Sequence, residues 1–382
     1  MGKIKIVAII VALFIVSFTS FFVLNGTRTK EARQATIQLR IMETNDLHGN
    51  MLDYDYKKGQ ETVEFGLARI ASLIKLSRME NANTLLFDVG DVLEGNALGK
   101  YALKSYKLDQ MQIHPVYKVM NLLHYDAGTV GNHEFKYGLR FLRESLNGAN
   151  FPYVNANIYI DDHNDVAIDD INFFNPYVII DKELIDTNGK KHVVKVGVIG
   201  LISPITEKWN KKFFRGNLKI KNMRETAEHF VPIMKEQGAD IIITLAHVAL
   251  KADKGLKHKE GNSVYSLSKV SGIDAILYGH SHLMFPVQDS KPVKKGVNPD
   301  EGTINGKAAV QAGYWGNHLG IIDLTLEKKK NGGWSVKNKQ SSLQPVCKTV
   351  NGKLKPLVPV DKTIVKVMEN IHLDTLKYLR SK

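Results

Sequence analysis

Apolar residues along the chain recur with two different periods, and each period predicts one kind of element. Short runs of apolar and β-branched residues predict strands at 36–43, 84–88, 127–130, 193–200, 241–246, 274–278, 308–311 and 320–326. Apolar residues spaced three and four apart predict helices at 66–81, 115–123, 139–146, 224–237 and 361–380. Segments rich in Lys, Pro and Gly predict a surface loop at 286–306 and a turn at 328–333. Strands that alternate with helices and end in hairpin-like strands are typical of a layered α/β domain.

The first residues differ from the others because they contain one long apolar stretch. Lys3 and Lys5 precede residues 6–24, which are almost wholly apolar, and this order is typical of an export signal. The stretch is longer than an ordinary signal core and no clear cleavage site follows it. We therefore expect residues 1–35 to be either a signal peptide or an N-terminal membrane anchor. Both alternatives place the remaining chain outside the cytoplasm, as a secreted, cell-surface or periplasmic protein, with a membrane tether through residues 6–24 in the second case.

Composition narrows the class of protein and the kind of metal site. The 382 residues are 43% hydrophobic and 24% charged, which excludes a disordered chain, a collagen-like fibre and a polytopic membrane protein. The formal net charge is +13, but the lysines are scattered and form no basic stripe with aromatic residues, so a nucleic-acid polymer is not expected as the main partner. Cys347 is the only cysteine, which excludes an internal disulfide, a thiolate zinc site and an iron–sulfur cluster. A bound metal must therefore be held by His, Asp, Glu or Asn.

Polar residues that can carry chemistry follow the predicted strands. They occur in five turns or strand ends: Asn45-Asp46-Leu47-His48, Gly90-Asp91, Gly131-Asn132-His133-Glu134, His247, and Gly279-His280-Ser281-His282. The carboxyl ends of strands are where α/β sheets build their sites. Each turn alone is a weak signal, but five in this order predict a common site.

The residue types in these turns suit a pair of divalent cations. Two cations about 3.5–4 Å apart need a shared carboxylate, neutral nitrogen donors and open positions for water and phosphate. The predicted ligands are Asp46, His48 and His282 for one cation, Asn132, His247 and His280 for the other, and Asp91 as the bridge. Neutral His and Asn donors keep the site from becoming too anionic to admit phosphate. His133 follows a ligand without being one, so we expect it to stabilise the phosphoryl oxygens or to protonate the leaving oxygen.

The residues resemble a known family, the calcineurin-like metallophosphoesterases, over about Ile41 to Ile322. Within the family they are similar to the bacterial branch of 5'-nucleotidases and 2',3'-cyclic-nucleotide 2'-phosphodiesterase/3'-nucleotidases. The segments that carry the resemblance are Asn45-Asp46-Leu47-His48-Gly49-Asn50, Gly90-Asp91 with Gly95-Asn96-Ala97-Leu98-Gly99, His114-Pro115-Val116-Tyr117, Gly131-Asn132-His133-Glu134-Phe135 with Tyr137-Gly138-Leu139, and Phe151-Pro152-Tyr153-Val154-Asn155-Ala156-Asn157. The last two segments look more like the cyclic phosphodiesterases than the plain 5'-nucleotidases.

The resemblance implies a fold and a reaction. It implies a four-layer α/β/β/α sandwich of two mixed sheets, in which all seven ligand positions of the family are matched. It also implies two divalent cations, with Mn, Zn, Co and Mg all open, that activate water for attack on phosphorus. The expected domains are a catalytic domain at 36–345 and a C-terminal tail with a linking helix at 346–382.

Two features depart from the family pattern. Plain 5'-nucleotidases have an aspartate three residues after the catalytic histidine, where it orients the ring, and this chain has Lys136 there. Asn96 and Lys136 are the predicted substrate contacts. Family members also continue past a linking helix, here resembling Ile364 to Leu379, into a nucleoside-binding domain that this sequence lacks. We therefore expect a fragment, a partner that supplies the rest, or an enzyme of broader selectivity.

Together these features predict an exported dinuclear phosphoesterase. Its expected substrates are small nucleotides, most of all 2',3'-cyclic nucleotides and 3'-nucleotides, and no obligate protein partner is inferred. Two alternatives stay open at this point. One is a 5'-nucleotidase or broad phosphomonoesterase, and the other is a noncatalytic surface binding protein on the same scaffold.

Overall fold

The computed structural model describes residues 35–381, except 107, 109–111, 165–169, 288–294 and 331. Its first sheet contains β1 (Thr36–Thr44), β4 (Thr84–Asp88), β5 (Ala127–Gly128), β16 (His318–Lys328) and β17 (Trp334–Pro345), in the order β17-β16-β1-β4-β5. β1, β4 and β5 run parallel, whereas β16 and β17 extend the sheet in antiparallel fashion. The sheet is therefore mixed.

The second sheet is also mixed. Its strands are β7 (Tyr177–Ile185), β8 (Lys191–Ile202), β10 (Ile241–His247), β11 (Ala275–Tyr278), β13 (Val297–Asn298), β14 (Thr303–Ile304) and β15 (Lys307–Ala312), in the order β13-β14-β15-β11-β10-β8-β7, and β12 (Met284–Phe285) pairs with β15. The centre, β8-β10-β11-β15, is parallel, and both flanks are antiparallel. Small two-stranded sheets join β2 (Tyr54–Asp55) to β3 (Gln60–Glu61), β6 (Ile158–Ile160) to β9 (Leu218–Ile220), and β18 (Cys347–Val350) to β19 (Lys353–Pro356).

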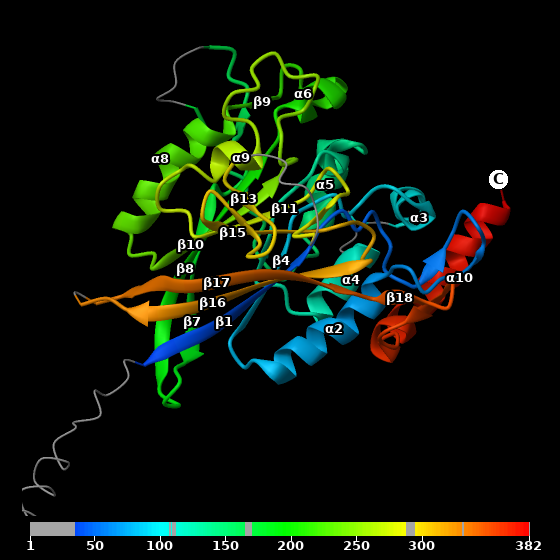
Figure 1. The fold of residues 1–382 in the computed structure, drawn as a ribbon. Helices are drawn as coiled ribbons and strands as arrows, with labels where there is room; N and C mark the ends of the chain where they lie inside the picture. The colour runs from blue at the N-terminus through cyan, green and yellow to red at the C-terminus, as the bar shows by residue number, and fades with distance from the viewer. Residues whose placement is uncertain are drawn as a thin grey trace, which may run out of the picture. The chain divides into compact units, whose positions relative to one another are not determined.

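Helices cover the outer face of each sheet. The helices are α2 (Leu67–Glu80), α3 (Ala97–Ser105), α4 (Pro115–Leu122), η2 (His133–Phe135), α5 (Leu139–Leu146), α6 (Ile205–Trp209), α7 (Lys211–Phe214), α8 (Met223–Glu236), α9 (Val264–Leu267) and α10 (Lys362–Arg380). In Figure 1, α2 and α4 lie on one side of β1 and β16, and α8 lies beside β8 and β10. The two sheets therefore form the inner layers between two sets of helices.

Strand periodicity explains this layering. On β10, Ile241 and Ile243 pack between the two sheets, whereas Ile242 faces the helices. β1 behaves in the same way, since Ile41 faces the second sheet and Met42 faces the helices. Successive strand residues point to opposite faces, so a strand that is apolar at every position must be covered on both sides. Three clusters of buried apolar side chains among the described residues separate four layers, which confirms the predicted α/β/β/α sandwich.

Most predicted elements are present, and the differences lie at the edges. The sequence patterns did not predict β7, β17 or α3, and the segment 286–306, expected to be a surface loop, contains the short strands β13 and β14. β7 and β17 each pair with one neighbour at a sheet margin, where polar and charged residues are tolerated and the apolar period is weak.

The sequence predicted a signal or anchor at the N-terminus and a domain boundary near the C-terminus. The expected signal or anchor at 1–35, including 6–24, lies almost wholly outside the described residues. No helix in the part that the structure describes is both long and apolar enough to cross a membrane. The boundary expected at 345 stays a prediction, although Val346 and residues of α10 such as Met368 join the same apolar cluster as α2 and α4.

Candidate metal centre

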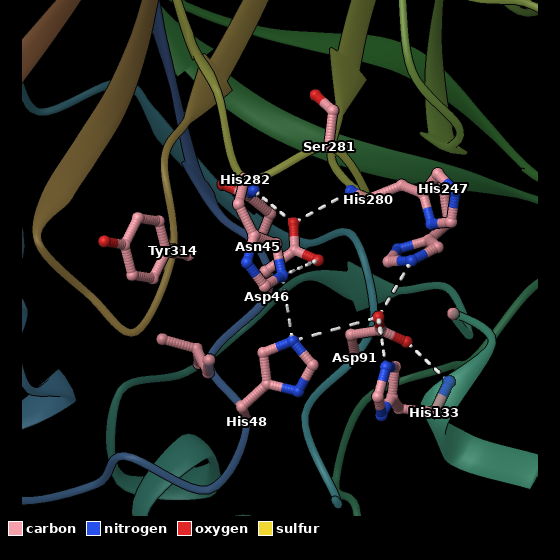
Figure 2. A network of polar contacts seen from close by, with 12 residues as sticks. Asn45, Asp46, His48, Asp91, His133, His247, His280, Ser281, His282 and Tyr314 are labelled. Atoms are coloured by element: carbon pink, nitrogen blue, oxygen red, sulfur yellow. Dashed lines mark hydrogen bonds and ion pairs between the residues drawn. The ribbon is translucent and has the colours of Figure 1, made fainter. Parts of the chain in front are cut away.

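The residues predicted to bind metal meet where strands of both sheets end. Asp46 and His48 follow β1, Asp91 follows β4, and Asn132 follows β5 in the first sheet. In the second sheet His247 is the last residue of β10, and His280 and His282 follow β11. Figure 2 shows the rings of His48, His133 and His247 around the carboxylate of Asp91. Side chains that are more than two hundred positions apart in the sequence therefore meet at the edge where strands of both sheets end.

One half of the centre joins Asp46, His48 and His282. The Nε2 atoms of His48 and His282 are 3.1 Å apart, and Nε2 of His282 is 3.4 Å from Oδ1 of Asp46. One ligand atom from each residue lies within 4.8 Å of the others, so a single cation can reach all three. This is the group predicted for the first cation.

The other half is arranged around Asp91. Its Oδ2 lies 3.1 Å from Nε2 of His247 and 4.0 Å from Nε2 of His48, so Asp91 faces both halves. Oδ1 of Asn132 and Nδ1 of His280 are 2.9 Å apart. The structure thus brings together every residue predicted to bind metal, with Asp91 between the two groups.

The backbone is unusual at these residues. Positive φ angles occur at Asp46 (48°), His48 (48°), Asp91 (59°), His280 (75°) and His282 (56°). This left-handed region is unfavourable for residues with a Cβ, and such strain concentrates at functional sites where the surrounding fold enforces it. These turns therefore direct the side chains of the proposed ligands toward a common point. The backbone conformation that this requires is energetically unfavourable.

Gly131 shows how closely the turns approach one another. A Cβ at this position would lie 2.2 Å from Oδ1 of Asp91 and 2.6 Å from Cε1 of His247. Only glycine leaves room for both side chains, so this glycine is required by a close approach rather than by its own dihedral angles.

Backbone and carboxylate groups hold the histidine rings. Nδ1 of His48 donates to the carbonyl of Glu94 at 2.6 Å, and Nδ1 of His247 donates to the carbonyl of Val89 at 2.8 Å. His280 contacts Oδ1 of Asp253 through Nε2 at 3.1 Å. In each ring one nitrogen is fixed in this way, and the other is left to face the centre, as in metal sites of proteins.

Charge and unsatisfied atoms fit a cation site. Burial alone would raise the pKa of Asp91, but neighbouring histidines, chiefly His247, outweigh it and lower that pKa. The pKa of Asp46 is also lowered, because His282 and other histidines outweigh burial. Within the described residues, the buried atoms Oδ1 of Asp46 and Nε2 of His247 make only ion-pair contacts, with His282 and Asp91, and no hydrogen bond of good geometry. Unpaired buried donors and acceptors are costly, and divalent cations would satisfy both.

His133 stands beside this centre with a carboxylate partner that the sequence patterns did not identify. Its Nδ1 contacts a carboxylate oxygen of Glu94, and its Nε2 is 4.0 Å from Oδ2 of Asp91. Lys136 is exposed at the end of η2. The side chain of Asn96 caps α3, where its Oδ1 accepts from the N–H of Leu98 at 3.0 Å. The substrate contacts expected of Asn96 and Lys136 stay predictions.

Glu134 is a second carboxylate to which the sequence patterns assigned no role. It is fully buried and accepts backbone N–H groups of Asp91 (2.7 Å), Val92 (2.6 Å), Leu93 (3.0 Å) and Gly131 (2.6 Å). It therefore ties the turn after β4 to the turn after β5. The available signal was its place directly after the predicted catalytic histidine, but four backbone donors leave no mark on a sequence.

Two aromatic rings border the centre. The ring of Tyr314 stacks on His282 with centroids 5.1 Å apart and an interplanar angle of 16° (Figure 2). Trp209 lies 5.4 Å from His280 at 30° and is 47% exposed. The sequence patterns assigned no role to Trp209. Both rings offer apolar surface next to the proposed ligands.

A family of known proteins matches the part of the chain that contains the centre. The calcineurin-like phosphoesterase family matches residues 39–284, which contain all the residues of the centre. The chain belongs to this family. A crystal structure of the calcineurin-like phosphoesterase YfkN from Bacillus subtilis superposes with a TM-score of 0.81 and 41% sequence identity, covering 90% of this chain and 99% of that one. A putative 5'-nucleotidase from Staphylococcus aureus, 22% identical with a TM-score of 0.64 over 88% of this chain and 58% of that one, shares the fold.

Curated relatives in the family carry names of nucleotide enzymes. The trifunctional nucleotide phosphoesterase protein YfkN of Bacillus subtilis (strain 168) is 42% identical over 92% of this chain and 23% of its own length. The 2',3'-cyclic-nucleotide 2'-phosphodiesterase/3'-nucleotidase of Yersinia enterocolitica is 41% identical over 92% of this chain and 52% of its own length. The chain thus spans about half the length, or less, of these curated relatives.

Proposed function

We propose that this member of the family is a two-metal phosphoesterase that hydrolyses 2',3'-cyclic nucleotides and 3'-nucleotides. The observation that carries the proposal is that ligand atoms of Asp46, His48 and His282 lie within 4.8 Å of one another, and that those of Asp46, Asp91 and His247 do the same. The names of the relatives that are 41–42% identical over about nine tenths of the chain support the substrate class. Relatives named 5'-nucleotidase are more distant, at 27–30% identity, which favours the cyclic-nucleotide alternative.

We propose a separate group of ligands for each cation. Asp46, His48 and His282 would hold one, Asn132, His247 and His280 would hold the other, and Asp91 would serve both. Two divalent cations at such a site activate water and neutralise charge that develops on the phosphoryl oxygens. The anionic Asp91 and the neutral ring nitrogens give a donor set that hard and borderline cations accept.

His133 is the proposed general acid. Its Nδ1 is engaged by Glu94, so Nε2 is the ring nitrogen left to face the centre, 4.0 Å from Oδ2 of Asp91. A histidine held in this way can donate a proton to the ribose oxygen as the bond to phosphorus breaks. It can also donate a hydrogen bond to the phosphoryl oxygens as their charge increases.

The aromatic rings support recognition of a base that lies near the phosphate. In 2',3'-cyclic and 3'-nucleotides the phosphate is attached to the sugar ring close to the carbon that carries the base, whereas a 5'-phosphate is set apart by an additional carbon. A ring directly beside the metal ligands, such as Trp209, is therefore better placed for the first class of substrate. Stacking on an exposed indole is favourable for every base, so we expect selectivity for the phosphate position rather than for the base.

A nucleotide panel tests the proposal. The purified chain, incubated with Mn²⁺, Zn²⁺, Co²⁺ or Mg²⁺, should hydrolyse 2',3'-cyclic AMP and 3'-AMP faster than 5'-AMP, and a chelator should abolish all three activities. Asp91→Ala serves as the matched inactive control. Preference for 5'-AMP would favour a 5'-nucleotidase, and lack of turnover with every cation would favour a noncatalytic binding protein.

Location is a separate proposal. The charges at Lys3 and Lys5 before the apolar residues 6–24 support export, with either a cleaved signal or an anchor. Fractionation of expressing cells tests it, because recovery of the full-length chain in the cytoplasm alone would contradict export.

A further inference from the structure

We infer that Glu94 is the positioning residue for His133, and that it supplies the carboxylate acceptor that Lys136 cannot provide. The inference rests on the proposed function, since it assigns a partner to the proposed general acid. Its basis is the contact between the Glu94 carboxylate and Nδ1 of His133, which links the turn after β4 to η2.

His133 is held from two directions. Its backbone N–H donates to Oδ1 of Asp91 at 2.7 Å, and its ring nitrogen Nδ1 meets the carboxylate of Glu94. Its ring stands nearly perpendicular to that of His48, at 85° with centroids 4.7 Å apart. Both partners of the ion pair are mostly shielded, with side-chain exposures of 31% for His133 and 20% for Glu94. A shielded charge-assisted hydrogen bond of this kind fixes the tautomer and the ring orientation.

Glu94 uses different groups for different histidines. Its backbone carbonyl accepts from Nδ1 of His48 at 2.6 Å, whereas its side chain engages His133. The carbonyl belongs to the turn and does not depend on the residue type. A substitution at Glu94 therefore releases the proposed general acid but leaves the hydrogen bond of the proposed metal ligand in place.

Position 136 explains why the carboxylate has to come from elsewhere. Residues 133–135 form the 3₁₀-helix η2, with Lys136 at its C-terminal end. In a 3₁₀-helix, side chains three residues apart lie above one another, so residue 136 stands on the same face as His133. The side chain of lysine has no hydrogen-bond acceptor, so Lys136 cannot accept a hydrogen bond from Nδ1–H of His133. Glu94 supplies the missing acceptor from the neighbouring turn.

The contact has a defined consequence for catalysis. With Nδ1 bound to the carboxylate, the ring is held with Nε2 toward the centre, in the orientation that a proton donor to the leaving oxygen needs. Loss of a partner that orients a histidine typically reduces activity by about 10- to 100-fold. The loss should depend on the leaving group, because a good leaving group departs without a proton.

The test is Glu94→Ala in the full chain, assayed with 3'-AMP and with p-nitrophenyl phosphate. We expect kcat for 3'-AMP to fall by about 10- to 100-fold with little change in KM, a much smaller fall for the nitrophenyl ester, and unchanged metal content. Glu94→Gln keeps an acceptor oxygen and should lose less. Glu80→Ala, which removes an exposed carboxylate paired with Arg40 before β4 begins, is the control and should match the wild type.

A double variant tests whether a carboxylate at position 136 can take the place of Glu94. Glu94→Ala combined with Lys136→Asp restores an acceptor on the face of His133 and should recover most of the lost kcat. Equal losses on both esters, loss of metal, or failure of Lys136→Asp to rescue would overturn the assignment.

An NMR measurement separates this inference from the proposed function. In ¹⁵N-labelled protein, the Nδ1–H of His133 should give a low-field proton signal that is absent in both His133→Ala and Glu94→Ala. If the signal is present and the wild type hydrolyses no phosphate ester, the proposed function fails while the pairing of Glu94 and His133 stands. If Glu94→Ala leaves the signal unchanged, the pairing itself is refuted.

Discussion

Glu134→Gln is the substitution whose effect on stability can be worked out most fully from the structure. The carboxylate of Glu134 accepts four backbone N–H groups, two on each oxygen: Asp91 and Gly131 on Oε2, and Val92 and Leu93 on Oε1. Burial and the charge of Asp91 raise the pKa of Glu134, and the backbone donors oppose this rise. Because four donors occupy the lone pairs of its two oxygens, we treat the group as a carboxylate in this arrangement. Glutamine has nearly the same shape but only one oxygen, and its NH₂ group would face two further donors.

The cost follows from the number of donors left without an acceptor. Two buried N–H groups lose their partners whichever way the amide is turned, and each unsatisfied buried donor costs about 1–3 kcal/mol. The expected loss in the free energy of unfolding is therefore about 2–6 kcal/mol. Because the same donors shape the turns that carry Asp91 and Asn132, metal affinity should fall as well.

Urea denaturation in the presence of a chelator measures this loss without a contribution from bound cations. Glu80→Gln, which changes an exposed carboxylate in the same way, is the matched control and should stay within about 0.5 kcal/mol of the wild type. A loss of less than 1 kcal/mol for Glu134→Gln would refute the reasoning. It would mean that the carboxyl group is protonated, or that water satisfies these donors.

Three other predictions concern the centre itself. His133→Ala should keep its metals and lose about 10²–10⁴-fold in kcat, measured by turnover and elemental analysis, whereas loss of metal would contradict its role. Gly131→Ala places a methyl group 2.2 Å from Oδ1 of Asp91, so metal affinity in a competition titration should fall about 10- to 100-fold. Wild-type affinity would contradict this, because it would mean that the turn can shift to make room for the methyl group. Trp209→Ala should raise KM for 2',3'-cyclic AMP several-fold and leave KM for p-nitrophenyl phosphate unchanged, while equal effects on both would exclude base stacking.

The strands of the two inner layers could be predicted from the sequence because they are apolar at almost every position, whereas their arrangement in four layers was implied by the family resemblance. β10 and the second half of β8 pair in the parallel part of the mixed second sheet, where both faces are covered and the apolar run is continuous. β7 and β17 are half-exposed and pair with only one long neighbour, which leaves a weaker pattern. The helix α3 begins with an Asn96 cap rather than with an apolar period, and the sequence patterns did not predict it.

The site was predictable in its side chains but not in its supporting contacts. Asp46, His280 and the other proposed ligands each follow a strand, so strand assignment alone brings them to one edge. Glu94 and Glu134 act through geometry that depends on how two turns meet, which no local pattern encodes. The positive φ angles of the ligand residues were not predicted either. Aspartate and histidine tolerate this region better than most residues with a Cβ, but which of them adopt it depends on the packing of the turns.

Metal stoichiometry tests the central claim most directly. The purified chain, dialysed against each divalent cation and analysed by mass spectrometry of the elements, should retain about two cations per chain, and Asp91→Ala should retain none under the same conditions. A wild-type chain that binds no divalent cation, or a variant that binds as many as the wild type, would contradict the assignment of a two-metal centre.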